Sequence, residues 1–117
     1  MSKIAQFFSE FYNMPPEYIE ELDKNIEEKQ LYEISERDIR DIIADFDTSK
    51  YNIELCKEQM KKLDEINAKN DIDYITFLDE EYPNRLKNID YYPKVLYYKG
   101  DISLLKKEKN IAVVGSR

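Results

Sequence analysis

The last three residues of the chain have the side chains that a phosphate-binding turn needs. Gly115, Ser116 and Arg117 directly follow residues 111–114, which are apolar throughout. Glycine lets a ligand approach the backbone closely, serine offers a hydroxyl and an N–H group, and arginine presents a planar fork of donors for bidentate phosphate contact. Such contacts read the nucleic-acid backbone and no base edge. The alternative is an ordinary strand-to-loop turn whose arginine is solvated.

A second candidate contact lies one predicted strand earlier, at Lys99 and Gly100. A plain turn explains this pair as well, with Gly100 supplying an unusual backbone conformation and Asp101 capping a following helix. In the preceding strand, Tyr97 and Tyr98 could stack on bases, as aromatic residues do in proteins that bind single strands. Because tyrosines in strands more often pack against helices, we expect packing for both.

The composition argues against catalysis and against a bound metal or cofactor. The chain of 117 residues contains no histidine and one cysteine, Cys56. Histidine is the commonest general base, and a single thiolate with carboxylates is a poor set of zinc ligands. Glu80 and Glu81 are adjacent in the sequence, so their carboxylates do not face each other as an acid–base pair. We therefore predict a protein that is not an enzyme and holds no metal and no cofactor.

The same sequence carries no sign of a membrane or a secretory route. No apolar run approaches the roughly 18–20 residues that cross a bilayer. The N-terminus also lacks the long apolar stretch and small-residue cleavage site of a signal peptide. We therefore expect a cytoplasmic protein without a membrane partner.

The negative charge of the chain lies in its first part. The net charge of −7 would by itself argue against a nucleic-acid partner. Residues 1–68 hold 9 Lys and Arg against 17 Asp and Glu, a net charge of −8, whereas residues 69–117 hold 9 against 8, a net charge of +1. Since each phosphate contact needs a cation, only the second part is expected to bind nucleic acid.

Residues 1–68 are predicted to fold into a bundle of four short amphipathic helices. Their apolar residues recur at the three- and four-residue spacing of helices that bury one face. Pro16 suits the first turn of the second helix, and Ser35 is placed to cap the third. The predicted buried stripes are Ile4, Phe7, Phe8, Phe11 and Tyr12; Tyr18, Ile19, Leu22 and Ile26; Ile39, Ile42, Ile43 and Phe46; and Cys56, Gln59 or Met60, Leu63 and Ile66.

Residues 69–117 alternate between predicted strands and short helices. The strands are expected at residues 74–78, 95–99 and 111–114, with short helices after Pro83 and at residues 102–108. This alternation is typical of the beginning of a Rossmann-like α/β domain. Residues 111–114 are apolar on both faces, which favours a strand in a parallel sheet. We therefore predict a domain boundary between residues 68 and 69.

The second part is too short to be a complete domain of this kind. We expect the chain to be the N-terminal fragment of a longer protein, cut off where the helix after Arg117 would begin. Strand 111–114 would then have apolar faces and an open edge. We expect them to be covered by docking on the helices or by strand pairing or swapping between two chains, so that the fragment self-associates.

Three motifs in this order resemble the DprA/Smf family of DNA-processing proteins. They are DEEYPNRLKNIDYYP at residues 79–93, VLYYKGD at residues 95–101 and IAVVGSR at residues 111–117. The resemblance implies an extended Rossmann-like fold that binds single-stranded DNA and hands it to a RecA-type recombinase during natural transformation. It implies a small helical domain of the sterile-alpha-motif (SAM)-like class for residues 1–68. It also strengthens the assignment of Gly115, Ser116 and Arg117 as DNA contacts in the intact protein.

Two other functions stay open on the residues alone. A strand that ends in Gly-Ser-Arg also suits a mononucleotide phosphate, so the chain could begin a Rossmann-type nucleotide enzyme. Alternatively, the acidic helical bundle could be a protein-interaction module, with DNA handled elsewhere. A large thermal shift with one nucleotide would favour the enzyme, and crosslinking of residues 1–68 to a recombinase would favour the interaction module.

Overall fold

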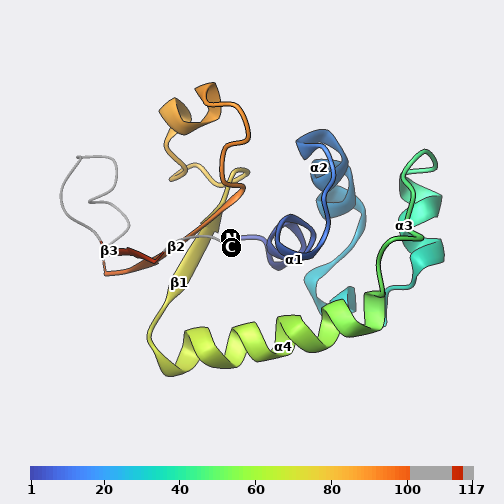
Figure 1. Cartoon of the computed structure of the whole chain (residues 1–117), viewed down its shortest axis with the longest axis horizontal. Coiled ribbons are helices and arrows are strands. Elements are labelled where there is room, and N and C mark those ends of the chain that lie inside the picture. Colours follow the sequence, from blue (N-terminus) through green and yellow to red (C-terminus); the bar gives the residue numbers. More distant parts are fainter. Residues whose placement is uncertain (101–111, 115–117) are drawn as a thin grey trace.

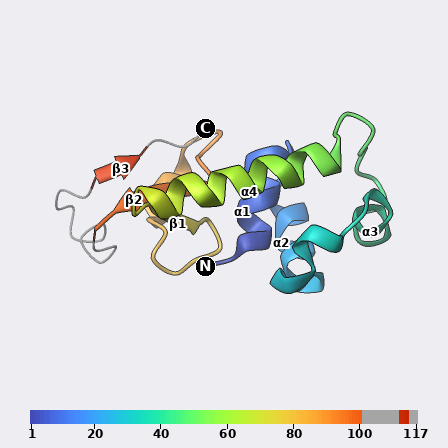
Figure 2. The same cartoon turned by 90° about the horizontal axis from the view of Figure 1, so that it is seen from below.

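A computed structural model describes residues 1–100 and 112–114 of the chain. Helices occupy one side of the molecule and a three-stranded sheet the other, while the long helix α4 runs below both (Figure 1). The view from below shows α4 crossing from the helices to the sheet (Figure 2). The predicted mixture of N-terminal helices with a small sheet is therefore confirmed.

The first two helices form where the apolar spacing predicts them. Helix α1 spans Lys3–Phe11, and Ser2 caps it by accepting a hydrogen bond of 3.0 Å from the backbone N–H of Ala5. Helix α2 spans Pro16–Asn25, with proline in its first turn. The hydroxyl of Ser2 also donates to the carboxylate of Asp23, so the start of α1 is tied to the end of α2. Both helices turn their apolar stripe inward, and α1 supplies the most deeply buried aromatic rings.

A short 3-10 helix, η1 (Glu28–Glu33), follows α2 and has no counterpart in the predicted elements. It begins with a capping box, in which the Glu27 side chain accepts from the backbone of Gln30 and the Gln30 side chain accepts from the backbone of Glu27. Six residues are too few to show a helical period in the sequence, so pattern analysis misses this element.

Helix α3 (Glu36–Ile42) starts as predicted but ends early. Ser35 accepts from the Asp38 N–H at 3.3 Å, and the Asp38 carboxylate accepts from the Ser35 N–H at 2.8 Å. The prediction that Phe46 lies on this helix is wrong. The side chain of Asp47 accepts from the backbone N–H of Ser49 at 2.9 Å, and such local bonds compete with helical ones. Phe46 still packs, against the rings of Tyr12, Tyr18 and Tyr51.

Helix α4 spans Ile53–Lys69 and is capped by Asn52, which accepts from the Leu55 N–H at 3.1 Å. Three of the four predicted stripe positions are buried, at Cys56, Met60 and Leu63, so Met60 and not the alternative Gln59 takes the second position. The fourth is not, because Ile66 keeps 48% of its surface exposed. The last turns of α4 pass beyond α1 and α2 (Figure 1), so neither of these two helices covers that end of α4.

The sheet has the order β1-β2-β3, with strands at Asp73–Thr76, Val95–Lys99 and Ala112–Val114. Both pairs are antiparallel, so the predicted parallel pairing is wrong for these strands. Parallel neighbours need a long crossover, usually an α-helix. Between β1 and β2 the chain forms only η2 (Asn84–Asn88), a 3-10 helix of five residues. The predicted helix at residues 102–108 lies outside the described residues.

The helices and the sheet share one core. Ile75, Phe77 and Val95 belong to the same buried cluster as the apolar residues of α1. The Tyr97 hydroxyl donates to Glu10 at 2.8 Å and accepts from the Gln6 side chain at 3.3 Å, linking β2 to α1. The predicted boundary after residue 68 falls in the last turn of α4, immediately before the sheet.

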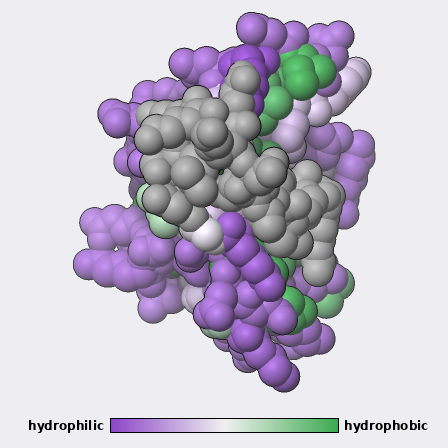
Figure 3. Space-filling view, turned by 90° about the vertical axis from the view of Figure 1, so that its left-hand side faces the viewer, coloured by the Kyte–Doolittle hydropathy of each residue, from purple (hydrophilic) through white to green (hydrophobic). Residues whose placement is uncertain are grey.

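The outer surface on the sheet side is largely polar. Among the atoms that Figure 3 colours, most are hydrophilic and the hydrophobic ones form small separate areas. In the described part of the chain, no helix is long and apolar enough to cross a membrane.

Candidate nucleic-acid interface

The antiparallel register decides which loops lie near the end of β3. Val95, which begins β2, pairs with Thr76, which ends β1. Val114 pairs with Tyr97, whereas Ala112 pairs with Lys99. The chain therefore leaves β3, toward Gly115, at the end of the sheet that also carries the connection of residues 77–94.

Lys99 and Gly100 lie at the opposite end, where the chain enters β3. Both are exposed, and Gly100 has a φ of 103°, a conformation that side-chain-bearing residues rarely adopt. The turn therefore explains why glycine occupies position 100. The prediction that this pair contacts DNA stays a prediction, but the antiparallel sheet separates it from Val114. Gly115, Ser116 and Arg117 lie outside the described residues.

A carboxylate holds the start of the 77–94 connection in place. Asp79 accepts a hydrogen bond of 2.7 Å from the backbone N–H of Thr76 and one of 3.3 Å from the Thr76 hydroxyl. Its other oxygen lies 3.5 Å from the N-terminal ammonium of Met1. These contacts give Asp79 a structural role at the end of β1.

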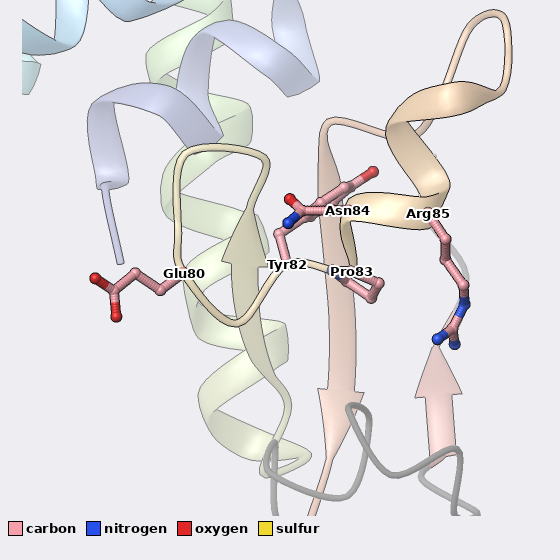
Figure 4. Close-up of a pocket in the computed structure, with 5 residues that line it drawn as sticks. All are labelled: Glu80, Tyr82, Pro83, Asn84 and Arg85. Carbon is pink, nitrogen blue, oxygen red and sulfur yellow. The ribbon is translucent and has the colours of Figure 1, made fainter.

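Glu80, Tyr82, Pro83, Asn84 and Arg85 line a hollow of about 290 Å³ beside the sheet (Figure 4). Glu80 and Arg85 lie on opposite sides of the view, and Arg85 points toward the end of β3. The Tyr82 ring is buried, and its hydroxyl donates to the carbonyl of Pro93 at 2.5 Å. Burial, and then the charge of Tyr92, raise the pKa of Tyr82 to about 12.

Cations follow along the same connection. The ammonium of Lys87 lies 5.6 Å from the centre of the Tyr82 ring, a cation–π contact. Arg85 and Lys87 are exposed, and Lys94 is half-buried directly before β2. Three positive side chains therefore belong to the loop at the end of the sheet where the chain leaves β3.

Two adjoining hollows lie further along this loop, where it faces the joint between α1 and α2. They measure about 430 and 400 Å³, and Tyr91, Tyr92 and Lys94 line both. Tyr91 is not among the residues that the sequence predicts as DNA contacts, because a Tyr-Tyr pair in a loop follows no period. In the sequence, the nearby turn-forming Pro93 indicates that this pair lies outside a strand.

The tyrosines that the sequence offered for stacking are buried. Tyr97 and Tyr98 expose 4% and 6% of their surface, so the expected packing is confirmed and base stacking is excluded for them in this conformation. The Tyr97 ring lies 6.4 Å from that of Tyr74 on β1.

Neither a metal centre nor a reactive thiol emerges from the described residues. Nowhere in residues 1–100 and 112–114 do three His, Cys, Asp or Glu side chains gather as metal ligands would. The Cys56 thiol is buried in the core, as predicted, and burial raises its pKa. A raised pKa lowers the thiolate fraction and so the reactivity of the sulfur.

Residues 73–117 match the sequence model of a known family, DNA recombination-mediator protein A. The match begins at the first residue of β1 and includes all three motifs on which the resemblance depends. No curated protein and no solved structure shows significant similarity to the chain. The family resemblance seen in the sequence is therefore confirmed for the sheet part of the molecule.

Proposed function

We propose that this chain, whose residues 73–117 belong to the DNA recombination-mediator protein A family, is part of a non-enzymatic protein that binds single-stranded DNA and passes it to a RecA-type recombinase. The observation that carries the proposal is the family match over the ordered motifs that end in Gly115, Ser116 and Arg117. The family supports a role in DNA processing and recombination, and the resemblance supports natural transformation as its setting.

Individual cations, and not the net charge of the loop, support a phosphate contact at this end of the sheet. The loop of residues 77–94 contributes Arg85, Lys87 and Lys94 there beside four carboxylates, and Arg117 follows three residues after Val114 in the sequence. Cations that neutralise phosphates release counterions, which supplies most of the affinity of sequence-independent binding. We therefore assign DNA binding to this end of the sheet, with Lys99 and Gly100 as a separate candidate.

The finer domain assignments belong to the same proposal. Residues 69–117 are assigned to the opening of a Rossmann-like domain, and residues 1–68 to a SAM-like helical domain. The shared core supports a positioning role for the helices, because α1 carries the hydrogen bonds that anchor β2. The net charge of −8 over residues 1–68 makes this part a poor surface for phosphate contacts and a candidate for protein contact.

Fluorescence anisotropy with labelled single- and double-stranded oligonucleotides tests the proposal. The samples are the chain of 117 residues, the longer protein in which we expect it to lie, and that longer protein with Arg117→Ala. We expect a preference for single strands in the longer protein. Loss of one phosphate contact in Arg117→Ala should reduce the slope of log K against log salt by about 0.7.

Removal of one positive charge at the other end of the sheet is the matched control that tests where DNA binds. Lys99→Ala should leave the salt slope unchanged if DNA binds where the chain leaves β3. An equal reduction of the salt slope in Lys99→Ala would show that the DNA site extends along β2. If the longer protein ignores DNA at low salt, the proposal fails and the nucleotide-enzyme and protein-docking hypotheses replace it.

A further inference from the structure

Tyr91 is the most exposed large hydrophobic side chain in the described part of the chain. Its surface is fully accessible at 102%, whereas the neighbouring Tyr92 is half-buried against Phe77 and Tyr82. The backbone of Tyr91 is also unusual, with a φ of 58°. A bulky residue in this left-handed conformation is a genuine outlier. Such outliers persist where the surrounding structure holds them, and they cluster at ligand sites.

The hollow beside Tyr91 has the size and lining of a small-molecule site. It measures about 430 Å³, within the usual range of ligand pockets. Met14, Pro15 and Pro16 form its apolar wall on the α1–α2 joint, and Asn13 adds an amide that can hydrogen-bond a ligand edge. Tyr91, Tyr92 and Lys94 form the opposite side. An apolar wall, an aromatic ring and one amide are suited to a flat heteroaromatic ring.

Lys94 can make one phosphate contact at the hollow. Among the residues that the structure describes, no carboxylate forms an ion pair with Lys94. Three carboxylates belong to the surroundings: Glu10 lines the adjoining hollow, the charge of Glu17 is, after burial, a cause of the raised pKa of Tyr92, and Asp90 directly precedes Tyr91 in the chain. Lys94 is therefore the group on this side that can neutralise a phosphate, while the base-sized hollow itself is mostly uncharged.

The position of the hollow joins it to the proposed DNA contact. Lys94 directly precedes β2, at the end of the sheet where the chain leaves β3 toward Gly115. In this region the loop contributes Arg85 and Lys87 as well. A strand bound by its phosphates at this end would pass beside Tyr91 with its bases free to turn toward the ring.

We propose that Tyr91 is a base-stacking residue for single-stranded DNA, with Lys94 contacting a phosphate of the same stretch of strand. The inference rests on the proposed function and extends it to residues outside the Gly-Ser-Arg motif. Stacking on an exposed ring requires a base that is not already paired and stacked in a duplex. The arrangement therefore also supplies a physical reason for a preference for single strands.

Substitution of Tyr91 in the longer protein tests the stacking contact. Tyr91→Ala should weaken binding of an oligothymidylate by about 5- to 150-fold, which corresponds to the ~1–3 kcal/mol of one stacked base. Tyr91→Phe should keep the affinity within about twofold, because the ring face is retained. Lys94→Ala should reduce the salt slope by about 0.7. Ile89→Ala is the matched control, because Ile89 is exposed in the same loop, at 54%, and has no ring.

An oligonucleotide with abasic sites separates stacking from a general loss of structure. The affinities of the unchanged protein and of Tyr91→Ala should converge on this ligand, since there is no base to stack. Tyr91→Asn, which tolerates the left-handed backbone, should lower affinity as Tyr91→Ala does without lowering the melting temperature. Glu17→Gln should raise the affinity by removing a negative charge beside the hollow.

The outcomes distinguish this inference from the proposed function. Binding of single strands that is unaffected by Tyr91→Ala would overturn the stacking role and leave the function standing. An equal loss of affinity in Ile89→Ala would also overturn the stacking role, and so would a loss of affinity in Tyr91→Ala that persists on abasic DNA. Either result would indicate a nonspecific effect on the loop. If the unchanged protein binds no DNA, the proposed function fails first and the stacking role fails with it.

Discussion

Two tyrosine hydroxyl groups in the core have opposite effects on the stability of the fold. The Tyr97 hydroxyl has a partner on each side, since it donates to Glu10 and accepts from Gln6. The Tyr12 hydroxyl is buried and has no hydrogen-bond partner among the described residues. Burial is the main cause that raises the pKa of Tyr12 well above its usual value. A buried hydrogen bond stabilises modestly, whereas an unmade one is costly.

These two tyrosines yield a matched pair of predictions on stability. Tyr97→Phe should lower the free energy of unfolding by about 1–3 kcal/mol, because it leaves the Gln6 amide buried without its partner. Tyr12→Phe should be neutral or stabilising, because it removes a buried polar group that has no partner. Urea denaturation followed by circular dichroism measures both. A larger loss in Tyr12→Phe than in Tyr97→Phe would contradict the assigned hydrogen bonds.

At the scale of elements, caps define where the helices begin more sharply than periodicity defines where they end. Ser2, Ser35 and Asn52 each accept a backbone hydrogen bond at the start of a helix. The end of α3 was harder to predict, because the apolar spacing continues to Phe46 while the backbone turns at Ile43. Competition from a local Asp47–Ser49 turn is not visible in a hydrophobic pattern.

The cap of α3 provides a prediction at this scale. Ser35→Ala should lower the free energy of unfolding by about 1 kcal/mol, because the Asp38 N–H loses its acceptor. Ser35→Gly should cost only a few tenths of a kcal/mol, since glycine at this position leaves the N–H open to water. Thermal or urea unfolding of both variants checks this. Equal losses in the two variants would show that the side chain acts through something other than the cap.

At the scale of the whole molecule, tyrosines with raised pKa values couple the stability of the fold to alkaline pH. Burial raises the pKa of Tyr82 to about 12 and, with the charge of Asp64 as a further cause, that of Tyr32 to about 12. Tyr12 and Tyr74 are shifted in the same direction, mainly by burial. The unfolded chain ionises tyrosine near its ordinary pKa of about 10. A folded-state pKa above that value stabilises the fold below pH ~10, and this contribution is lost as the pH rises through the folded value.

We therefore expect the free energy of unfolding to fall steadily between about pH 10 and pH 12. Urea titrations across this range, with tyrosinate absorbance followed in parallel, measure the effect. Tyr82→Phe should flatten the decline, because phenylalanine cannot ionise. A stability that stays constant through this range would show that these phenols ionise as easily in the folded state as in the unfolded one.

The sequence by itself determined the features that depend on neighbouring residues. Apolar spacing and capping residues predicted α1, α2 and α4 and the start of α3, because these elements are stabilised by bonds and faces a few positions apart. Strand-forming residues predicted β1 and β2. The ordered motifs of residues 79–117 predicted the family, which the match over residues 73–117 confirms.

Only the tertiary structure decided how distant segments meet. Antiparallel pairing placed Lys99 where the chain enters β3 and the 77–94 loop where it leaves, and no local pattern specifies strand direction. Residues of the same type also differ in burial: Tyr97 and Tyr98 are core residues, while Tyr91 is exposed beside a hollow. A side chain's environment is set by the elements that pack around it, and those elements come from sequence positions far from it.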